Sequence, residues 1–318
     1  MVSSVERNQF GQREKLPTLI IGYARLNNIR DLIKEAINFG VDKIYLHLDL
    51  GKNDELRASQ EHFCKEIKSD FGDKVIIKLA KENLGVARSV CSAIDWFFSF
   101  EKSGVILEDD LIVTKTTFEF FRVAIPHLDL NSRCLLISGS TFLREEGHES
   151  ELNIMWTNFP LIWGWATTSS RWKILKDLMI QPLPRKWFVS RIRGFLSVGA
   201  YGALTCSIDT WDSPIALGMW INKYLCMAPP HNLVSNNGAD LLATHTKREE
   251  FPIGNPIIEF DISAINFVEP NPKSIKRANE RIIRQNYVLR PHHVVAPLIL
   301  RLRAADQGTL RRKLNDEF

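Results

Sequence analysis

The chain has 318 residues, of which 45% are hydrophobic and 25% are charged, as in an average soluble globular protein. This composition excludes a mainly disordered chain, a collagen-like fibre and a coiled coil, and no apolar run is long enough to span a bilayer. The net charge of +4 is uneven: residues 271–318 hold 11 Lys and Arg against 4 Asp and Glu, whereas the remaining residues hold 30 against 33.

Short apolar runs alternate with helical patterns over the first 140 residues. Strands are predicted at 17–23, 43–48, 74–79, 104–107 and 133–137. Helices are predicted at 29–37, followed by Gly40 as a helix stop, and at 54–69, 86–100 and 118–125. This alternation predicts an α/β fold in which helices flank a mostly parallel sheet.

The alternation ends near Ser140, where aromatic residues and short polar segments take over. Helices are predicted in this part at 169–178 and 214–224, and again in a basic segment after about residue 270. The five cysteines lie far apart without CxxC spacing, which favours buried thiols over a disulfide framework or a zinc site. The polar N-terminal segment lacks the features of a signal peptide, so we expect a cytoplasmic protein.

Ligands of open parallel sheets bind beyond the carboxyl ends of the strands. Three predicted strand ends carry polar residues: Tyr23–Arg25 after the first strand, Asp49 after the second and Glu108–Asp110 after the fourth. Three consecutive carboxylates repel one another, and a hard divalent cation such as Mg²⁺ or Mn²⁺ relieves that repulsion. A solvated acidic turn before the next helix is the alternative interpretation of the triplet.

Two common nucleotide-binding motifs are absent from the sequence. The junction between the first strand and its helix reads GYARLNN, without the glycine pattern of a dinucleotide-binding turn, and no P-loop occurs. Arg25 instead places a cation where a phosphate can be bound.

Five segments of the sequence serve as motifs for comparison with known families: NLGVARS (83–89), ILEDDL (106–111), FPLIWGWATT (159–168), DTWD (209–212) and SNNGADLLATHT (235–246). Together they resemble the GT-A glycosyltransferases, in particular N-acetylglucosaminyltransferase I and bacterial sugar transferases of surface-polysaccharide synthesis. The resemblance covers roughly residues 16–247. It implies a nucleotide-sugar donor, expected to be a UDP-sugar, and a glycan or lipid-linked glycan as acceptor.

The resemblance also implies roles for residues around the donor. Arg25 would meet the diphosphate and Asp49 the nucleotide base. The remaining donor-side residues would line the nucleotide pocket or face the sugar and ribose: Asn83, Arg88, Glu108 and Asp109.

For the metal and the chemistry, the resemblance implies that Asp110 contacts Mn²⁺ or Mg²⁺ and that His245 reaches the metal or the diphosphate. Asp212 would be the catalytic base of an inverting transfer, with Asp209 close enough in sequence to take that role instead. From the residues alone, Asp212 also suits the start of the helix predicted near residue 214, and His245 suits a structural hydrogen bond.

The predicted organisation is a GT-A domain at 16–250, with a nucleotide-binding half (16–140) and an acceptor half (141–250), followed by a basic helical extension at 251–318. The extension either contacts the cytoplasmic face of the inner membrane or packs against the rest of the chain or a second subunit. Outside residues 271–318 the chain carries a slight excess of acidic residues, 33 against 30 basic ones, which argues against nucleic-acid binding. A sugar nucleotidyltransferase and a non-catalytic sugar-nucleotide or glycan-binding protein stay open as alternatives.

Overall fold

The structure, a computed structural model, describes residues 15–143, 152–180, 211–236 and 256–286. Within these ranges one eight-stranded sheet has the order β3-β2-β1-β4-β8-β6-β9-β7, and a small sheet pairs β10 with β5. The strands are β1 (Thr18–Gly22), β2 (Ile44–Leu48), β3 (Val75–Leu79), β4 (Ser103–Glu108), β5 (Leu111–Val113), β6 (Cys134–Ser138), β7 (Met155–Thr157), β8 (Trp165–Thr168), β9 (Leu225–Ala228) and β10 (Val234–Asn236). The α-helices are α1 (Leu26–Asn38), α2 (Asp54–Phe71), α3 (Val86–Phe98), α4 (Lys115–Ala124), α5 (Ser169–Ile180), α9 (Asp212–Asn222) and α10 (Pro272–Asn286), and the 3-10 helices are η1 (Gly72–Lys74), η2 (Ile125–Leu130) and η3 (Ile262–Ala264).

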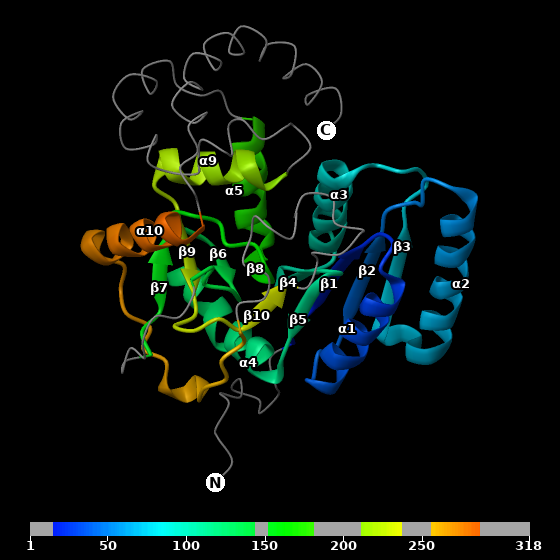
Figure 1. Cartoon of the computed structure of the whole chain (residues 1–318), viewed down its shortest axis with the longest axis horizontal. Helices are drawn as coiled ribbons and strands as arrows, with labels where there is room; N and C mark the ends of the chain where they lie inside the picture. The colour runs from blue at the N-terminus through cyan, green and yellow to red at the C-terminus, as the bar shows by residue number, and fades with distance from the viewer. Residues whose placement is uncertain (1–14, 144–151, 181–210, 237–255, 287–318) are drawn as a thin grey trace, which may run out of the picture.

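Parallel pairing dominates the first half of the large sheet. β1 lies between β2 and β4 and pairs parallel with both, and β2 pairs parallel with β3. β8 runs antiparallel between β4 and β6, whereas β6 and β9 are parallel. Helices α3, α5 and α9 cover one face and α1, α2 and α4 the other (Figure 1). The predicted α/β class, with a mostly parallel sheet between helices, is confirmed.

Because both faces are covered, the central strands are mostly apolar, and every residue of β1 and β2 is buried, the polar Thr18 and His47 included. α1 buries Ile29, Leu32, Ile33 and Ala36, the spacing of one helical face. Burial of each of the three Ile and Leu side chains contributes roughly 1.5–3 kcal/mol to folding, and that of Ala36 less. The helix ends where predicted, because Gly40 adopts a φ of 81° that favours glycine.

The second half contains strands that the sequence pattern does not predict. β7, β8 and β9 are three or four residues long, too short for an apolar period to identify them. β8 nevertheless joins the two halves, because it forms ladders with both β4 and β6. α9 begins at Asp212, two residues before the predicted start.

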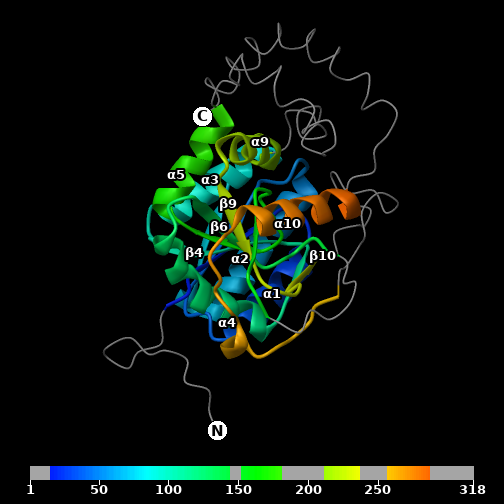
Figure 2. The ribbon, with the colours of Figure 1, turned by 90° about the vertical axis from the view of Figure 1, so that its left-hand side faces the viewer.

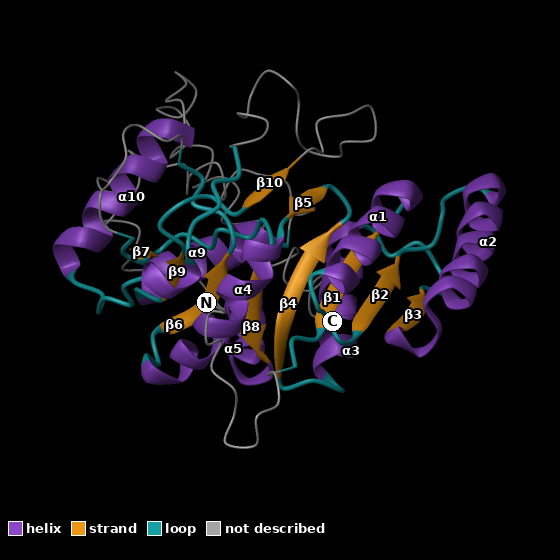
Figure 3. Ribbon diagram, turned by 90° about the horizontal axis from the view of Figure 1, so that it is seen from below, coloured by secondary structure: helices purple, strands orange, loops and turns teal. Residues whose placement is uncertain are grey.

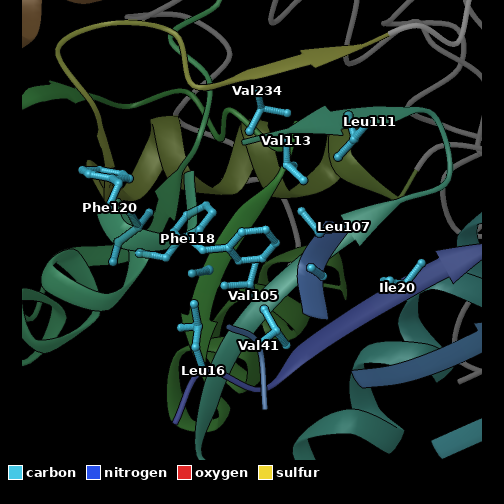
Figure 4. Packing of buried hydrophobic residues seen from close by; sticks show 14 of the residues in the cluster. Leu16, Ile20, Val41, Val105, Leu107, Leu111, Val113, Phe118, Phe120 and Val234 are labelled. Atoms are coloured by element: carbon cyan, nitrogen blue, oxygen red, sulfur yellow. The ribbon is translucent and has the colours of Figure 1, made fainter. Parts of the chain in front are cut away.

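The small sheet lies beyond the carboxyl end of β4 (Figure 3). Its residues Val113 and Val234 are register partners, and together with Leu111 they pack toward Leu107 and Phe118 in one apolar cluster (Figure 4). This contact holds Asn236, the last residue of β10, opposite Leu111 and directly beside the acidic triplet.

α10 belongs to the predicted C-terminal extension and packs against β7, at the end of the sheet farthest from α2 (Figures 1 and 2). Buried Asn279 accepts hydrogen bonds from the Thr157 hydroxyl (2.7 Å) and from the backbone N–H of Asn158 (3.0 Å). The basic segment after residue 286 lies outside the described residues, so its contact with a membrane stays a prediction. In the described part of the chain, none of the helices is long and apolar enough to cross a bilayer.

The described cysteines are free thiols. Cys91, Cys134 and Cys226 are buried and Cys64 is half-buried, in agreement with the predicted buried thiols. Burial raises the pKa of each of these thiols, which keeps them protonated near neutral pH.

The buried His47 side chain makes folding sensitive to acid. Among the described residues neither of its ring nitrogens has a hydrogen-bond partner. Burial, and secondarily the charge of Lys78, lowers the pKa of His47 from 6.5 to about 4. The unfolded chain therefore takes up this proton first as the pH falls, and the folded state loses stability between the two values, by roughly 3 kcal/mol in total.

Replacing His47 by leucine should remove this contribution. We expect the free energy of unfolding of His47→Leu to fall less steeply than that of the wild type between pH 6.5 and pH 4, as measured by urea unfolding at each pH. Equal slopes for the two proteins would contradict the assignment of a neutral, buried His47.

Candidate functional site

The parallel register places three polar strand ends at one edge of the large sheet. Gly22, the last residue of β1, is opposite Leu48 of β2, and Ile21 is opposite Glu108 of β4. Tyr23–Arg25, Asp49 and Glu108–Asp110 therefore follow neighbouring strands at the same edge, as the sequence predicts. In Figure 3 the arrowheads of β2, β3 and β4 point toward this edge.

Asp109 fixes the chain as it leaves β1. Its Oδ2 accepts a hydrogen bond from the backbone N–H of Tyr23 (3.0 Å), and its Oδ1 pairs with Nη1 of Arg25 (3.0 Å). Both side chains are largely buried, with 14% of Arg25 and 11% of Asp109 exposed. A side chain at Gly22 would displace Ile29 and crowd Asp109, because its Cβ would lie 2.4 Å from Cδ1 of Ile29 and 3.3 Å from Oδ2 of Asp109.

Asp49 is 5% exposed and fixes the turn before α3. Its Oδ1 accepts the backbone N–H groups of Leu50 (3.1 Å) and Leu84 (2.8 Å), and its Oδ2 accepts that of Gly85 (3.0 Å). Burial raises the pKa of Asp49, and these backbone hydrogen bonds oppose the shift. The amide of Asn83 donates to the carbonyl of Leu50 (2.7 Å) and lies 3.4 Å from Oδ2 of Asp49.

Negative charge gathers where β4 ends. Burial, followed by the charges of Asp110, Asp109 and Asp212, raises the pKa of Glu108 well above its ordinary value, and Arg25 opposes the shift. Burial and Asp109 likewise raise the pKa of Asp110. The fold thus brings Asp212, at the start of α9, within electrostatic reach of the acidic triplet.

Of the other predicted site residues, one lies away from the acidic end of β4 and two fall outside the described residues. Arg88 lies in the first turn of α3, with 41% of its side chain exposed, and pairs with Glu82 at 3.7 Å. Asp209 and His245 fall outside the described residues, so their roles stay predictions. Trp211, beside the predicted base, is buried and stacks on Trp165 with ring centroids 5.8 Å apart. These two rings are therefore part of the core.

Two polar residues at this edge were missed by sequence reasoning. The side chain of Asn236 donates a hydrogen bond to Asp110, which opposes the rise of that pKa. Gln60 of α2 is fully buried and binds the backbone at the ends of β1 and β2. Its sequence signal is a polar residue on the apolar face that Phe63 and Ile67 define, at the spacings i+3 and i+7.

The donor atoms at this edge suit a hard divalent cation. Among the described residues no group of three His, Cys, Asp or Glu side chains is arranged to hold a metal ion. Mg²⁺-type ions, however, are commonly held by one or two carboxylates, with phosphate oxygens and water completing the shell. Glu108 and Asp110 match that donor set, whereas Asp109 already binds Arg25 and the backbone.

Comparisons with known proteins give only remote likenesses. No protein-family model matches the sequence, and no curated protein sequence matches it. The mannosyltransferase PcManGT from Pyrobaculum calidifontis, solved in complex with GDP-Man and Mn²⁺, is 11% identical with a TM-score of 0.42, and the match covers 71% of this chain and 58% of that chain. HddC from Yersinia pseudotuberculosis, complexed with GMP-PN, is 10% identical with a TM-score of 0.31, over 56% of this chain and 86% of that chain. Likenesses this remote assign no activity to the chain.

The geometry of Asp109 predicts a loss of stability when its charge is removed. Asp109→Asn should lower the free energy of unfolding by roughly 2 kcal/mol, because the largely buried Arg25 loses its ion pair. Removal of the repulsion between Asp109 and the carboxylates of Glu108 and Asp110 offsets part of the loss. The free energy of unfolding of each protein is measured by urea unfolding.

The matched control for Asp109→Asn is Asp54→Asn. Asp54 forms an ion pair with Arg57 in which its own side chain is 98% exposed, so its loss should change stability by no more than about 0.5 kcal/mol. Similar effects of the two substitutions would contradict a structural role for Asp109.

Proposed function

We propose that this protein is a metal-dependent, inverting glycosyltransferase that moves a sugar from a nucleotide-sugar donor, by preference a UDP-sugar, to a hydroxyl of a glycan or lipid-linked glycan. One observation carries the proposal: Asp212 lies close enough to Glu108 for its charge to raise the pKa of that carboxyl, at the edge of the sheet where Arg25 also lies. These residues come from three separate parts of the chain, and together they offer both a cation site and a base.

The leaving group of such a reaction is a nucleoside diphosphate, on which negative charge grows as the bond to the sugar breaks. A divalent cation bound by Asp110 and Glu108 would supply Lewis-acid stabilisation of that charge. Arg25 would bind the same diphosphate from the end of β1, held in place by Asp109. Asn83 and Arg88 flank the start of α3, on the side where the nucleotide would lie.

The acceptor hydroxyl must lose its proton as it attacks the anomeric carbon. Asp212 is proposed as the general base, because its carboxylate lies near Glu108 and belongs to the first turn of α9. A single displacement needs one base and inverts the anomeric centre. Asp209 remains the alternative base.

The nucleotidyltransferase alternative has less support from the chain. Such an enzyme binds a nucleoside triphosphate, for which a glycine-rich loop after the first strand is suited, whereas here Tyr23 and Arg25 lead directly into α1 at Leu26. Release of pyrophosphate from a nucleoside triphosphate and a sugar phosphate would favour that alternative. Metal-dependent nucleotide binding without any turnover would favour a binding protein.

Replacing Asp212 by asparagine tests the catalytic part of the proposal. We expect the affinity for the nucleotide sugar to be unchanged and the turnover to fall by about 10²–10⁴-fold, because the base is lost while the donor site is not. Turnover is measured as release of the nucleoside diphosphate from the nucleotide sugar, with water or an added glycan as acceptor.

The substitution also separates the base from a helix start. Asp212 is the first residue of α9, where replacing its carboxylate by an amide of the same size costs only about 0.3–1 kcal/mol of helix stability, so a purely structural role predicts that Asp212→Asn keeps full turnover. Asp209→Asn is measured in parallel. A large loss in Asp209→Asn together with full turnover in Asp212→Asn would move the base to Asp209.

A further inference from the structure

Gln60 is a buried polar residue on the core face of α2. None of its surface is exposed, and its amide group makes three hydrogen bonds. Nε2 donates to the carbonyl oxygens of Tyr23 and Asp49, both at 2.8 Å, and Oε1 accepts the backbone N–H of Gly51 at 2.8 Å. Both N–H donors and the oxygen of the amide are therefore used to bind the backbone of two loops.

The two loops belong to neighbouring strands at the candidate site. Tyr23 follows β1 and leads to Arg25, whereas Asp49 and Gly51 follow β2. Parallel pairing ends with the strands, because beyond them the two chain segments diverge toward α1 and α2. The buried side chain of Gln60 supplies two hydrogen bonds that continue the connection past the end of the sheet, and at the exposed side the backbone N–H of Lys52 donates to the hydroxyl of Tyr23 at 3.2 Å.

The bonds of Gln60 extend into those of the two carboxylates described above. The N–H of Tyr23 donates to Asp109, and the carboxylate of Asp49 accepts the N–H groups of Leu84 and Gly85. One continuous set of hydrogen bonds therefore runs from the end of β4, through β1 and β2, to the start of α3. Gln60 is its central member, since it contacts both loops at once.

We propose that Gln60 is a positioning residue for the donor diphosphate: its amide holds the loops after β1 and β2 in the arrangement that places Arg25 and the Asn83–Gly85 turn around the nucleotide. This inference rests on the proposed function, because the donor site is the one defined there. Gln60 touches neither donor nor metal in this role and acts only through the backbone of Tyr23, Asp49 and Gly51.

Burying a side-chain amide in the core costs free energy, because its polar atoms lose their hydrogen bonds to water. The same face of α2 is otherwise apolar, with Phe63 and Ile67 buried beside Gln60, and an apolar residue would pack there without burying polar atoms. Once the amide is removed, however, two carbonyls and one N–H lose their partner. The presence of glutamine at this position is therefore explained by its hydrogen bonds to the backbone of the two loops, and less by its packing in the core.

The test compares two substitutions at position 60 with a matched change on the same helix. Gln60→Leu removes all three hydrogen bonds, and Gln60→Glu keeps the size of the side chain while facing an oxygen toward the carbonyls of Tyr23 and Asp49. Ile67→Ala, two turns along the same face, weakens the packing of α2 without touching either loop. Should Gln60→Leu fail to fold, Gln60→Glu carries the comparison.

Two readouts are needed. The first is the affinity for UDP, GDP, CDP and dTDP in the presence of Mn²⁺, by calorimetric titration. The second, which needs no ligand, is deuterium exchange of backbone amides in peptides that contain Gly51 and Leu84–Gly85, because these N–H groups are bonded to Gln60 and Asp49.

We expect both Gln60 variants to bind the preferred diphosphate at least about tenfold more weakly than the wild type, the scale of one lost hydrogen bond at a buried polar group. Exchange at Gly51 should rise, and in turnover assays KM for the donor should rise more than kcat falls. Ile67→Ala should keep the wild-type affinity even where its loss of stability is as large.

Three outcomes would overturn the inference, and they are distinguishable. Faster exchange at Gly51 with unchanged nucleotide affinity would show that the loop connection does not matter for binding. An equal loss of affinity in Ile67→Ala would reduce Gln60 to general packing of α2. If the wild type binds none of the four diphosphates, the proposed function fails, and the exchange data then assign Gln60 to the architecture of the sheet alone.

Discussion

Parallel pairing of β1 with both β2 and β4 is the constraint on which the site depends. It places the three strands side by side between the helices that cover both faces of the sheet, which demands the mostly apolar runs seen in the sequence, and it sends all three carboxyl ends to one edge. The polar residues after each strand then meet, although they are far apart in the chain. β8 extends this arrangement to the second half of the protein, because its ladders with β4 and β6 place the second half of the chain in the same sheet.

The acidic residues at this edge divide into two groups. The carboxylates of Asp49 and Asp109 are bonded to backbone N–H groups and to Arg25, so their charges hold loops in place. Glu108 and Asp110 instead lie buried among like charges: burial, followed by repulsion from Asp110, Asp109 and Asp212, raises the pKa of Glu108, and burial and Asp109 raise that of Asp110. Such repulsion between carboxylates is retained in a fold where a bound cation or a catalytic step needs the negative charge. A preorganised site is expected to contain both kinds of acidic residue, those that hold loops and those that repel one another.

The sequence predicts the first half well, because its strands and helices are long enough for their apolar periods to be read. The acidic triplet and Arg25 were found for the same reason: each directly follows a clear strand. The short strands of the second half give no such signal, so the contact of Asn236 with Asp110 could not be foreseen. Gln60 was missed because a polar residue in a charged helix suggests the surface, and only the structure shows its face turned to the core.

The central claim is that the acidic edge binds a nucleoside diphosphate together with a divalent cation. The most direct test is calorimetric titration of the wild type with UDP, GDP, CDP and dTDP, each with and without Mn²⁺, and of Asp110→Asn under the same conditions. The account predicts that one diphosphate binds only when Mn²⁺ is present and that Asp110→Asn loses the metal-dependent part of the affinity. Binding of none of the four, or the same metal-dependent affinity in Asp110→Asn, would contradict it.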